Sequence, residues 1–238
     1  MRTVLESTDS VLNAAWKMVA DSRFSVFDAL ISYEQTAGRG QYGRSWISPQ
    51  GNVYAAIRLP NTAPFNNTEA ALVLSCCIAA TLADFGFDIK IKWLNDLVIE
   101  GGKVAGILLE QKGEKLIAGI GINLVSSPDS LSLRENAALP AISLYSVDPE
   151  IARNLTPEII VENLADRLAK LDLGSFSTSW RNEAFSRLLW LNEKVCLDVD
   201  GSLVTGVLVG IDERGGLLLA TGEGIQTFMR GAIRKVSE

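Results

Sequence analysis

The stretch TAGRGQYGRSW, residues 36–46, lies between two apolar segments with strand character, 24–33 and 51–59. It contains three glycines and two arginines. Glycine lets a ligand approach the backbone closely, and arginine carries forked donors suited to carboxylate and phosphate. The pattern predicts a loop that joins two strands at the end of a sheet and can clamp an anion. Taken alone, such a short stretch is more often a solvated surface turn.

The chain on either side of this loop alternates between strand and helix patterns. Ser7, Thr8 and Asp9 supply capping residues between a short strand, 2–6, and a helix of amphipathic spacing. The segment 68–85 is apolar nearly all round, which predicts a buried helix. The remaining expectations are strands at 89–93, 97–100, 103–111 and 116–125, with a Gly-Gly turn in the hairpin, a loop at 126–140, and helices at 156–171 and 176–191, the last with Trp180, Phe185, Leu188 and Leu189 facing inward.

The pattern changes near Asn192, after which short strands alternate with tight turns. Strands are expected at 195–199, 203–211, 217–220 and 225–229. This texture is typical of a small all-β barrel of about 45 residues. A unit of that size is marginal as an independent folder, so we expect it to pack on the preceding part of the chain.

Composition excludes several kinds of chemistry. The chain has 238 residues and no histidine, which removes Ser-His-Asp and Cys-His catalysis and histidine-ligated metals. Its formal net charge is −6. An acidic chain is a poor match for a nucleic-acid backbone, so we expect no DNA binding. Catalysis would then depend on lysine, arginine, carboxylates, amides or a bound cation.

The three cysteines, Cys76, Cys77 and Cys196, fit neither a disulfide framework nor a zinc site, and we expect them to be buried and reduced. The first ten residues lack the apolar region of a signal peptide. No stretch reaches the about 20 apolar residues of a membrane span. These features predict a soluble, cytoplasmic protein without a membrane partner.

Four motifs follow one another at expected strand ends and turns. They are GRGQYGRSW at 38–46, KWLND at 92–96, KVAGILLE at 103–110 and GIGINL at 119–124. In this order they resemble the biotin protein ligases, whose members show GRGRxGRxW, KWPND, KxxGIL and GxGIN after an S-T-N element, here Ser7-Thr8-Asp9. The resemblance covers essentially the whole chain.

The resemblance, together with the element pattern, implies an α+β fold. We expect a mixed β-sheet with helices on one side, as in biotin/lipoate ligase-like catalytic domains, followed by a small SH3-like β-barrel. The predicted domains are 1–190 and 191–238.

The implied activity has two steps. The biotin carboxylate attacks the α-phosphate of ATP, giving biotinyl-5′-AMP and pyrophosphate. A lysine of a biotin carboxyl carrier domain then attacks the mixed anhydride and displaces AMP. Neither step needs a histidine, and bringing two anions together calls for Arg, Lys and Mg²⁺.

The resemblance also implies residue roles. The expected catalytic residues are Lys103, which would neutralise the biotin carboxylate and the α-phosphate, Arg39, and Asp96, which would orient Mg²⁺ or the acceptor lysine. The expected biotin-binding residues are Ser7, Thr8, Asp9, Gln35, Gly38, Arg39, Gly40, Gln41 and Lys103. The expected adenylate-binding residues are Arg44, Trp46, Lys92 and Asn123.

Three positions depart from the family pattern. Asp9 replaces Asn and adds a negative charge near a carboxylate-bearing ligand unless it points away. Leu94 replaces Pro in the KWPND motif. Gln41 stands where many members carry a basic residue, and glutamine cannot form an ion pair with phosphate. We therefore predict that Gln41 weakens the retention of biotinyl-AMP.

Two alternatives stay open at this stage: a lipoate- or octanoate-attaching enzyme of the same fold, and a non-catalytic biotin-binding module. Some family members carry an N-terminal winged-helix domain, for which this chain has no room, so no repressor function is expected. A homodimer is neither predicted nor excluded.

Overall fold

The computed structural model describes residues 1–128 and 139–236, so most of the loop predicted at 126–140 lies outside the described residues. The main unit contains β1 (Arg2–Leu5), α1 (Val11–Ala20), β2 (Ala29–Ser32), the short 3₁₀ helix η1 (Gln41–Gly43), β3 (Val53–Leu59), α2 (Ala70–Asp84), β4 (Lys90–Lys92), β5 (Asp96–Ile99), β6 (Gly102–Lys112), β7 (Lys115–Ile122), α3 (Leu144–Val147), α4 (Pro149–Ala152), α5 (Pro157–Ala169) and α6 (Leu173–Arg187). The C-terminal unit contains β8 (Lys194–Val199), β9 (Ser202–Ile211), β10 (Leu217–Thr221), β11 (Gly224–Phe228) and β12 (Ala232–Lys235).

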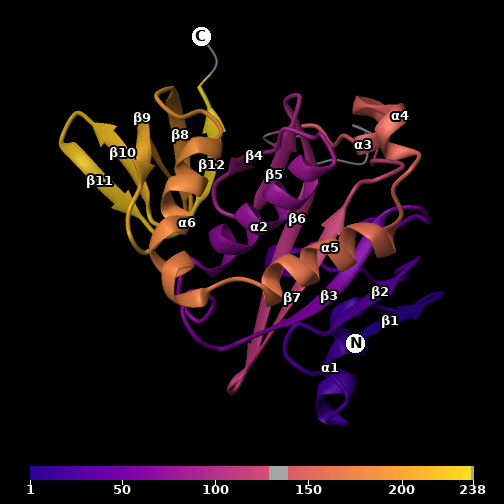
Figure 1. Ribbon diagram of the computed structural model, residues 1–238. Helices are drawn as coiled ribbons and strands as arrows, with labels where there is room; N and C mark the ends of the chain where they lie inside the picture. Colours follow the sequence, from indigo (N-terminus) through magenta and orange to yellow (C-terminus); the bar gives the residue numbers. More distant parts are fainter. Residues whose placement is uncertain (129–138, 237–238) are drawn as a thin grey trace.

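The main unit is built on a seven-stranded mixed sheet with strand order β1-β2-β3-β7-β6-β5-β4 (Figure 1). β1 and β2 are parallel and α1 connects them, whereas the other neighbouring strands are antiparallel. The predicted loop 36–46 connects β2 to β3. The expected α+β class with a mixed sheet is therefore confirmed.

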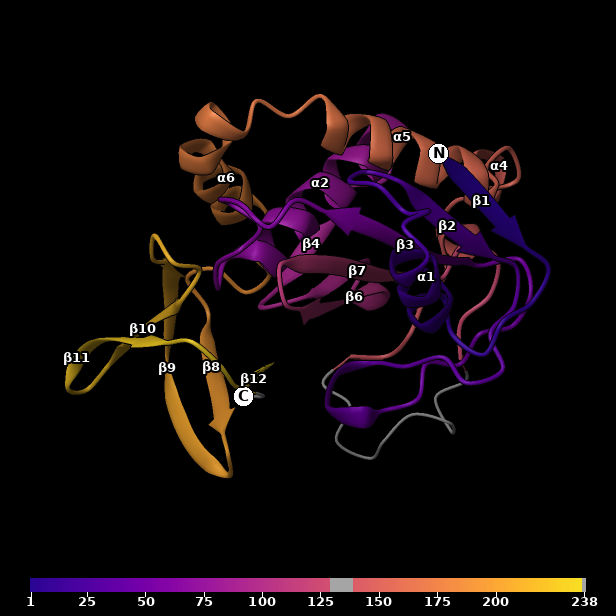
Figure 2. The ribbon, with the colours of Figure 1, turned by 90° about the horizontal axis from the view of Figure 1, so that it is seen from below.

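Helices cover both faces of this sheet, which corrects the expectation of helices on one side only. α2 and α5 pack on one face, whereas α1 packs on the other (Figure 2). The division follows strand alternation: Ala55 and Ile57 of β3 belong to the α2/α5 core, and Tyr54 and Ala56 belong to the α1 core. Strand β3 is apolar on both sides because each side has its own helical cover.

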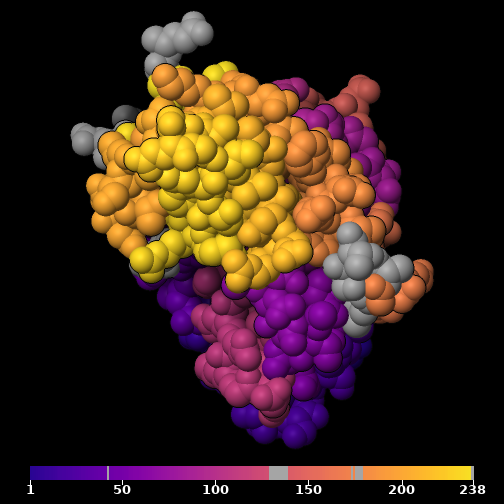
Figure 3. Space-filling model, turned by 90° about the vertical axis from the view of Figure 1, so that its left-hand side faces the viewer, coloured from indigo at the N-terminus to yellow at the C-terminus, as the bar shows by residue number. Residues whose placement is uncertain are grey.

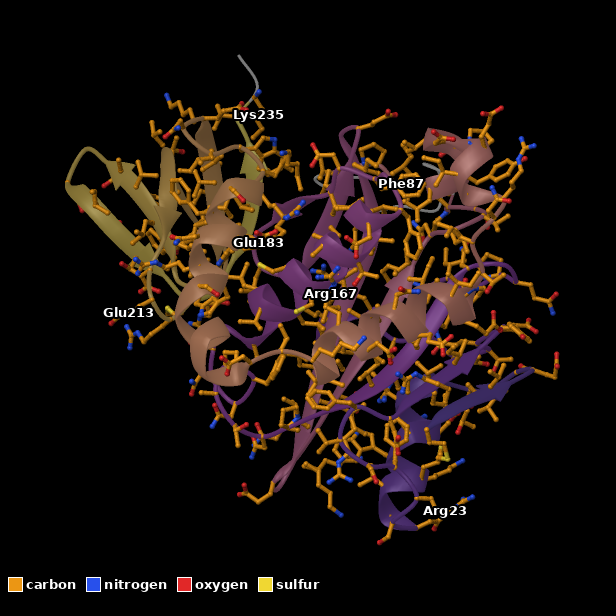
Figure 4. The ribbon with its side chains drawn as sticks, viewed as in Figure 1. Arg23, Phe87, Arg167, Glu183, Glu213 and Lys235 are labelled. Carbon is orange, nitrogen blue, oxygen red and sulfur yellow. The ribbon has the colours of Figure 1, made fainter. Side chains whose placement is uncertain are left out.

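The α2/α5 face is sealed, as the apolar helix pattern predicted. Cys76 and Cys77 of α2 are free and buried, and burial raises the pKa of both thiols, so they stay protonated at neutral pH. Arg167 of α5, labelled in Figure 4, donates from Nε to Thr81 Oγ1 of α2 at 3.1 Å. The cysteines are core residues, in agreement with the expectation.

Two local expectations were wrong. No side chain of the Ser7–Asp9 segment caps α1; the carbonyl oxygen Oε1 of Gln35 instead accepts from the Val11 amide at 2.9 Å. Phe185 is 44% exposed rather than inward-facing. Helix α6 buries Trp180 and Ala184, and Leu188 directly after its end continues this spacing of four residues; Phe185 lies beside that buried stripe.

The C-terminal unit is a five-stranded antiparallel sheet with order β11-β10-β9-β8-β12, consistent with an SH3-like fold. The pattern analysis missed β12. The sheet packs on the main unit, as expected (Figure 3), because its buried residues join the α2/α5 core. Trp93 Nε1 also donates to Gly215 O at 2.8 Å, and Thr68 Oγ1 donates to Arg214 O at 2.7 Å. The boundary at 190/191 stays a prediction.

Candidate active site

A pocket of about 530 Å³ opens on the α1 face of the main sheet, beside the C-terminal unit. Segments far apart in the sequence form its wall: the start of α1, the loop 38–46, the turn 92–96, and strands β6 and β7. The turns at 198–201 and 230–232 of the C-terminal sheet complete it. Of the predicted site residues, those that line the pocket are Gln35, Arg39, Gly40, Gln41, Arg44, Trp46, Lys92, Asp96 and Lys103.

The Gly/Arg loop is folded back on itself as a narrow hairpin. Trp46 N donates to Gly38 O at 2.8 Å and Gly40 N donates to Arg44 O at 2.7 Å, with η1 at the tip. A Cβ at Gly38 would lie 2.5 Å from Trp46 O and 2.7 Å from Ser48 Oγ. Only glycine fits that close approach, so the first glycine of the motif shapes the loop.

The Trp46 indole lies over a pair of glycines that face each other across two strands. Gly106 of β6 and Gly121 of β7 are registered partners, and a Cβ on Gly121 would meet indole atoms at 2.5–2.8 Å. Within the described part of the chain, the buried Trp46 Nε1 has no hydrogen-bond partner. The glycines of the GxGIN and KxxGIL motifs therefore provide a flat floor on which a planar ring can lie.

Asp96 lies between two lysines at one end of the pocket. Its Oδ1 is 2.5 Å from Lys103 Nζ, and its Oδ2 is 3.5 Å from Lys92 Nζ. Burial lowers the pKa of Lys92, and the attraction of Asp96 opposes that shift. Two ammonium groups on one carboxylate leave an excess positive charge, which favours an anionic ligand at this end.

Lys103 reaches the pocket because strand β6 is irregular there. β5 and β6 pair Leu97 with Ala105 but the next residue, Val98, with Lys103, so one residue of β6 is extra. In a regular strand Lys103 would share the face of Ala105, which belongs to the α2/α5 core. The bulge shifts the alternation by one residue and places Lys103 on the pocket face.

Arg39 enters from the loop and is held on two sides. Its Nη2 is 3.0 Å from Glu110 Oε1 of β6 and donates to Asn13 Oδ1 of α1 at 3.0 Å. Gln41 and Arg44 lie further along the same hairpin and also line the pocket.

The other predicted binding residues lie at or behind the pocket wall. Thr8 pairs with Gln35 across a short β-bridge, and the Gln35 Nε2 group donates to Ser48 Oγ at 3.0 Å. Asp9 accepts from Ser10 N and from Asn13 Nδ2, each at 2.7 Å, so its carboxylate is turned toward α1. Those hydrogen bonds lower the pKa of Asp9. Ser7 is exposed after β1 and Gly38 is buried beside Gln35.

Asn123 is buried behind the pocket rather than lining it. Its Nδ2 donates to Ile142 O at 3.1 Å, and its backbone amide donates to Val104 O at 2.8 Å. Ile142 N in turn donates to Lys103 O at 3.0 Å. In this structure the GxGIN asparagine fastens the segment after 139 to β6, next to Lys103.

The sequence analysis missed the contribution of the C-terminal sheet. Asp198, Asp200 and Arg230 line the pocket, and Arg230 Nη2 is 2.6 Å from Asp200 Oδ2. These residues follow the last motif, which ends at residue 124, by about 75 positions for the two aspartates and about 105 for Arg230. They lie at strand ends and turns that look ordinary in the sequence, so no pattern could assign them to the site.

Among the described residues, no helix is long and apolar enough to cross a membrane. The same residues contain no group of three or more acidic or cysteine side chains arranged to hold a metal ion.

Comparisons with known proteins identify the class of protein to which this fold and pocket belong. Residues 20–126 match the model of the biotin/lipoate A/B protein ligase family, and residues 191–235 match the biotin protein ligase C-terminal domain. A biotin–[acetyl-CoA-carboxylase] ligase of Paracoccus denitrificans is 33% identical over 241 residues, covering 94% of this chain and 96% of that protein. The chain therefore belongs to the biotin protein ligase family, as the four motifs suggested.

Two further relatives extend the likeness. The bifunctional ligase/repressor BirA of Escherichia coli is 30% identical over 218 residues, covering 87% of this chain and 65% of that protein. The biotin protein ligase of Aquifex aeolicus, solved in complex with biotin and ATP, is 29% identical and superposes with a TM-score of 0.78 over 99% of both chains.

Proposed function

We propose that this chain is an ATP-dependent biotin–protein ligase. The biotin carboxylate attacks the α-phosphorus of ATP, the bond to the β-phosphate oxygen breaks, and pyrophosphate leaves. The amine of an acceptor lysine then attacks the acyl carbon of biotinyl-5′-AMP, loses a proton, and displaces AMP. The product is an amide between biotin and the acceptor.

The observation that carries this proposal is the meeting of Arg39, Lys92 and Lys103 in one pocket. They come from a loop, a turn and a bulged strand, and Asp96 is shared by the two lysines. An incoming anion would stabilise the charged form of Lys92, which burial disfavours. The pocket suits two anions that must approach each other, which is the requirement of the first step.

Roles follow from position. Lys103 neutralises the carboxylate and the α-phosphate as they meet, and Arg39, which lines the same pocket, binds the biotin carboxylate. The glycine floor holds the Trp46 indole, which we assign to the adenine side of the pocket. Arg44 and Lys92 bind the adenylate phosphate. Gln35, Gly40 and Gln41 line the part of the pocket that binds biotin.

Mg²⁺ enters with ATP, as part of the substrate complex. Each Asp96 oxygen already faces a lysine, so the predicted metal role of Asp96 requires one of these pairs to open. Mg²⁺ commonly takes most of its ligands from phosphates and water. Asp96 therefore fits better as the partner that orients Lys92 and Lys103.

The acceptor we propose is the biotin carboxyl carrier domain of an acetyl-CoA carboxylase, since the Paracoccus denitrificans relative is named for that substrate. We further propose that the enzyme is cytoplasmic. We also propose that it does not bind DNA, because a net charge of −6 is a poor match for a nucleic-acid backbone. Light scattering of the purified chain decides between a monomer and a homodimer.

The test is biotin-dependent ATP/pyrophosphate exchange with Mg²⁺, with a parallel lipoate reaction. Exchange with biotin alone supports the proposal. Exchange with lipoate alone would assign the chain to the lipoate-attaching branch of the class. Biotin binding without exchange would leave only a binding module.

A further inference from the structure

Arg39 is held by a chain of side chains that the four motifs do not explain. Both contacts of its guanidinium are made at one nitrogen, Nη2, which lies 3.0 Å from Glu110 Oε1 and 3.0 Å from Asn13 Oδ1. The two partners come from β6 and α1, on either side of the loop. Within the described residues, Nε and Nη1 of Arg39 have no protein partner.

Glu110 is itself fixed. Its second oxygen, Oε2, accepts from Trp16 Nε1 of α1 at 2.8 Å. The ring of Trp16 is covered by the Lys112 ammonium, 4.5 Å from the ring centroid. The Glu110 side chain is 24% exposed, compared with 42% for Arg39. A carboxylate bound at both oxygens and half-buried has little freedom, so it is a rigid anchor for a more mobile guanidinium.

Asn13 is oriented in the same way. Its Nδ2 donates to Asp9 Oδ2 at 2.7 Å, and this leaves Oδ1 as the atom that faces Arg39. Asp9 is held by the Ser10 amide at 2.7 Å. At position 9, where the family pattern has Asn, the Asp9 carboxylate accepts a hydrogen bond from Asn13. Asp9 does not line the pocket, so its negative charge is directed away from the ligand.

We propose that Glu110 and Asn13 are positioning residues for biotin binding. They hold Arg39 at Nη2 and leave the N–H groups of Nε and Nη1, which point to different sides of the guanidinium, as separate donors for the ligand. This inference rests on the proposed function, since it assigns the biotin carboxylate to Arg39.

The consequence concerns affinity more than turnover. A preorganised guanidinium spares the ligand the entropy of ordering a long side chain. Without Glu110 or Asn13, Arg39 remains present but samples other rotamers. Biotin binding then weakens, whereas the Lys92–Asp96–Lys103 group, which neither residue contacts, keeps its geometry.

The experiment is calorimetric titration of the full chain with biotin in the absence of ATP. Glu110→Gln, which keeps an acceptor for Trp16, is expected to raise the Kd by about tenfold, the equivalent of one charged hydrogen bond. Asn13→Ala is expected to raise it by about fivefold, as for a neutral acceptor. Glu114→Gln, on the exposed tip of the same hairpin, is the matched control, with a change below about twofold.

A double-mutant cycle separates positioning from general stability. If Glu110 acts through Arg39, Glu110→Gln adds little to Arg39→Gln, and the combined loss is well below the product of the two. In exchange assays the KM for biotin rises, while kcat and the KM for ATP stay within about twofold.

Two outcomes would overturn the inference: losses that multiply in the cycle, or Kd values for both single variants that match the control. No biotin binding by the unsubstituted chain would instead overturn the proposed function. The two failures are thereby distinguishable.

Discussion

The two faces of the seven-stranded sheet are made by the same strands and have opposite character. Toward α2 and α5, β7 presents Ala118 and Ile122, and the face is sealed by apolar helices. Toward α1, the alternating positions of the same strand are Gly119 and Gly121, which accept Leu12 and the Trp46 indole. One face is filled for stability, and the other is kept shallow and lined with charge.

The difference shows how one strand serves two purposes. Side chains alternate between faces, so adjacent residues of β6 and β7 can be selected separately for packing and for binding. Substitutions on the α2/α5 face should then change unfolding with little effect on ligands. Substitutions on the pocket side of the α1 face should change ligand binding, whether or not they also change unfolding.

The largest expected effect is on the α1 face. Lys103→Ala removes an ammonium from the point where carboxylate and phosphate meet, so the biotin-dependent exchange rate should fall by about 10²–10³-fold. Asp96 keeps Lys92 as a partner, and the melting temperature should change little. The matched control is Lys115→Ala at the exposed end of the same hairpin. An equal loss in both variants would contradict the assignment of Lys103.

The next effect tests the glycine floor. Gly121→Ala would place a Cβ 2.5–2.8 Å from indole atoms of Trp46, so the indole must move and the loop with it. Overpacking of this kind costs about 1–3 kcal/mol in unfolding free energy. Urea titration measures the cost, and the KM for biotin should rise. Gly222→Ala, which meets no atom within 4 Å, should change neither quantity.

A smaller effect is expected at the tip of the loop. Gln41→Arg restores a charge that can pair with the adenylate phosphate, so biotinyl-AMP should dissociate about tenfold more slowly, as for one charged contact. Release of radiolabelled biotinyl-AMP from the purified complex measures the rate. Dissociation as fast as in the unsubstituted chain would show that Gln41 does not limit retention.

The smallest effect lies on the sealed face. Ile122→Val removes one methylene from a fully buried site, with an expected loss of about 0.5–1.5 kcal/mol in unfolding free energy. KM values for biotin and ATP should stay unchanged. Ile225→Val on the exposed β11 is the control and should change stability by less than about 0.5 kcal/mol. A clear rise in either KM for Ile122→Val would break the separation of the two faces.

Much of the fold could be predicted because local patterns decide it. The apolar run of α2, the Thr156 cap and Pro157 of α5, and the turn-rich C-terminal strands all formed as expected. The errors lie where a tertiary neighbour competes with a local signal. Ser7–Asp9 resembles a helix cap, but Gln35 reaches the first amide of α1 instead. Phe185 resembles a core aromatic, but α6 buries the neighbouring stripe.

The candidate site could also be predicted only in part. The motifs named Arg39, Lys92, Asp96 and Lys103, and the structure brings all four to one pocket. Glu110 is the last residue of the motif KVAGILLE, but the sequence assigned it no role. Its partners Arg39 and Trp16 come from segments distant in the chain, so no local pattern reveals these contacts. Arg230 belongs to the pocket only because the C-terminal sheet packs beside it.

The sequence by itself determined which residues carry charge, where the glycines permit close approach, the absence of histidine chemistry, and the family through the order of four motifs. The tertiary structure alone decided which way those residues face. A single extra residue in β6 turns Lys103 from the core to the pocket, and α1 and β6 together set the direction of Arg39. Composition and spacing are properties of one chain segment, whereas the direction of a side chain depends on strand register and on neighbours that only folding brings into contact.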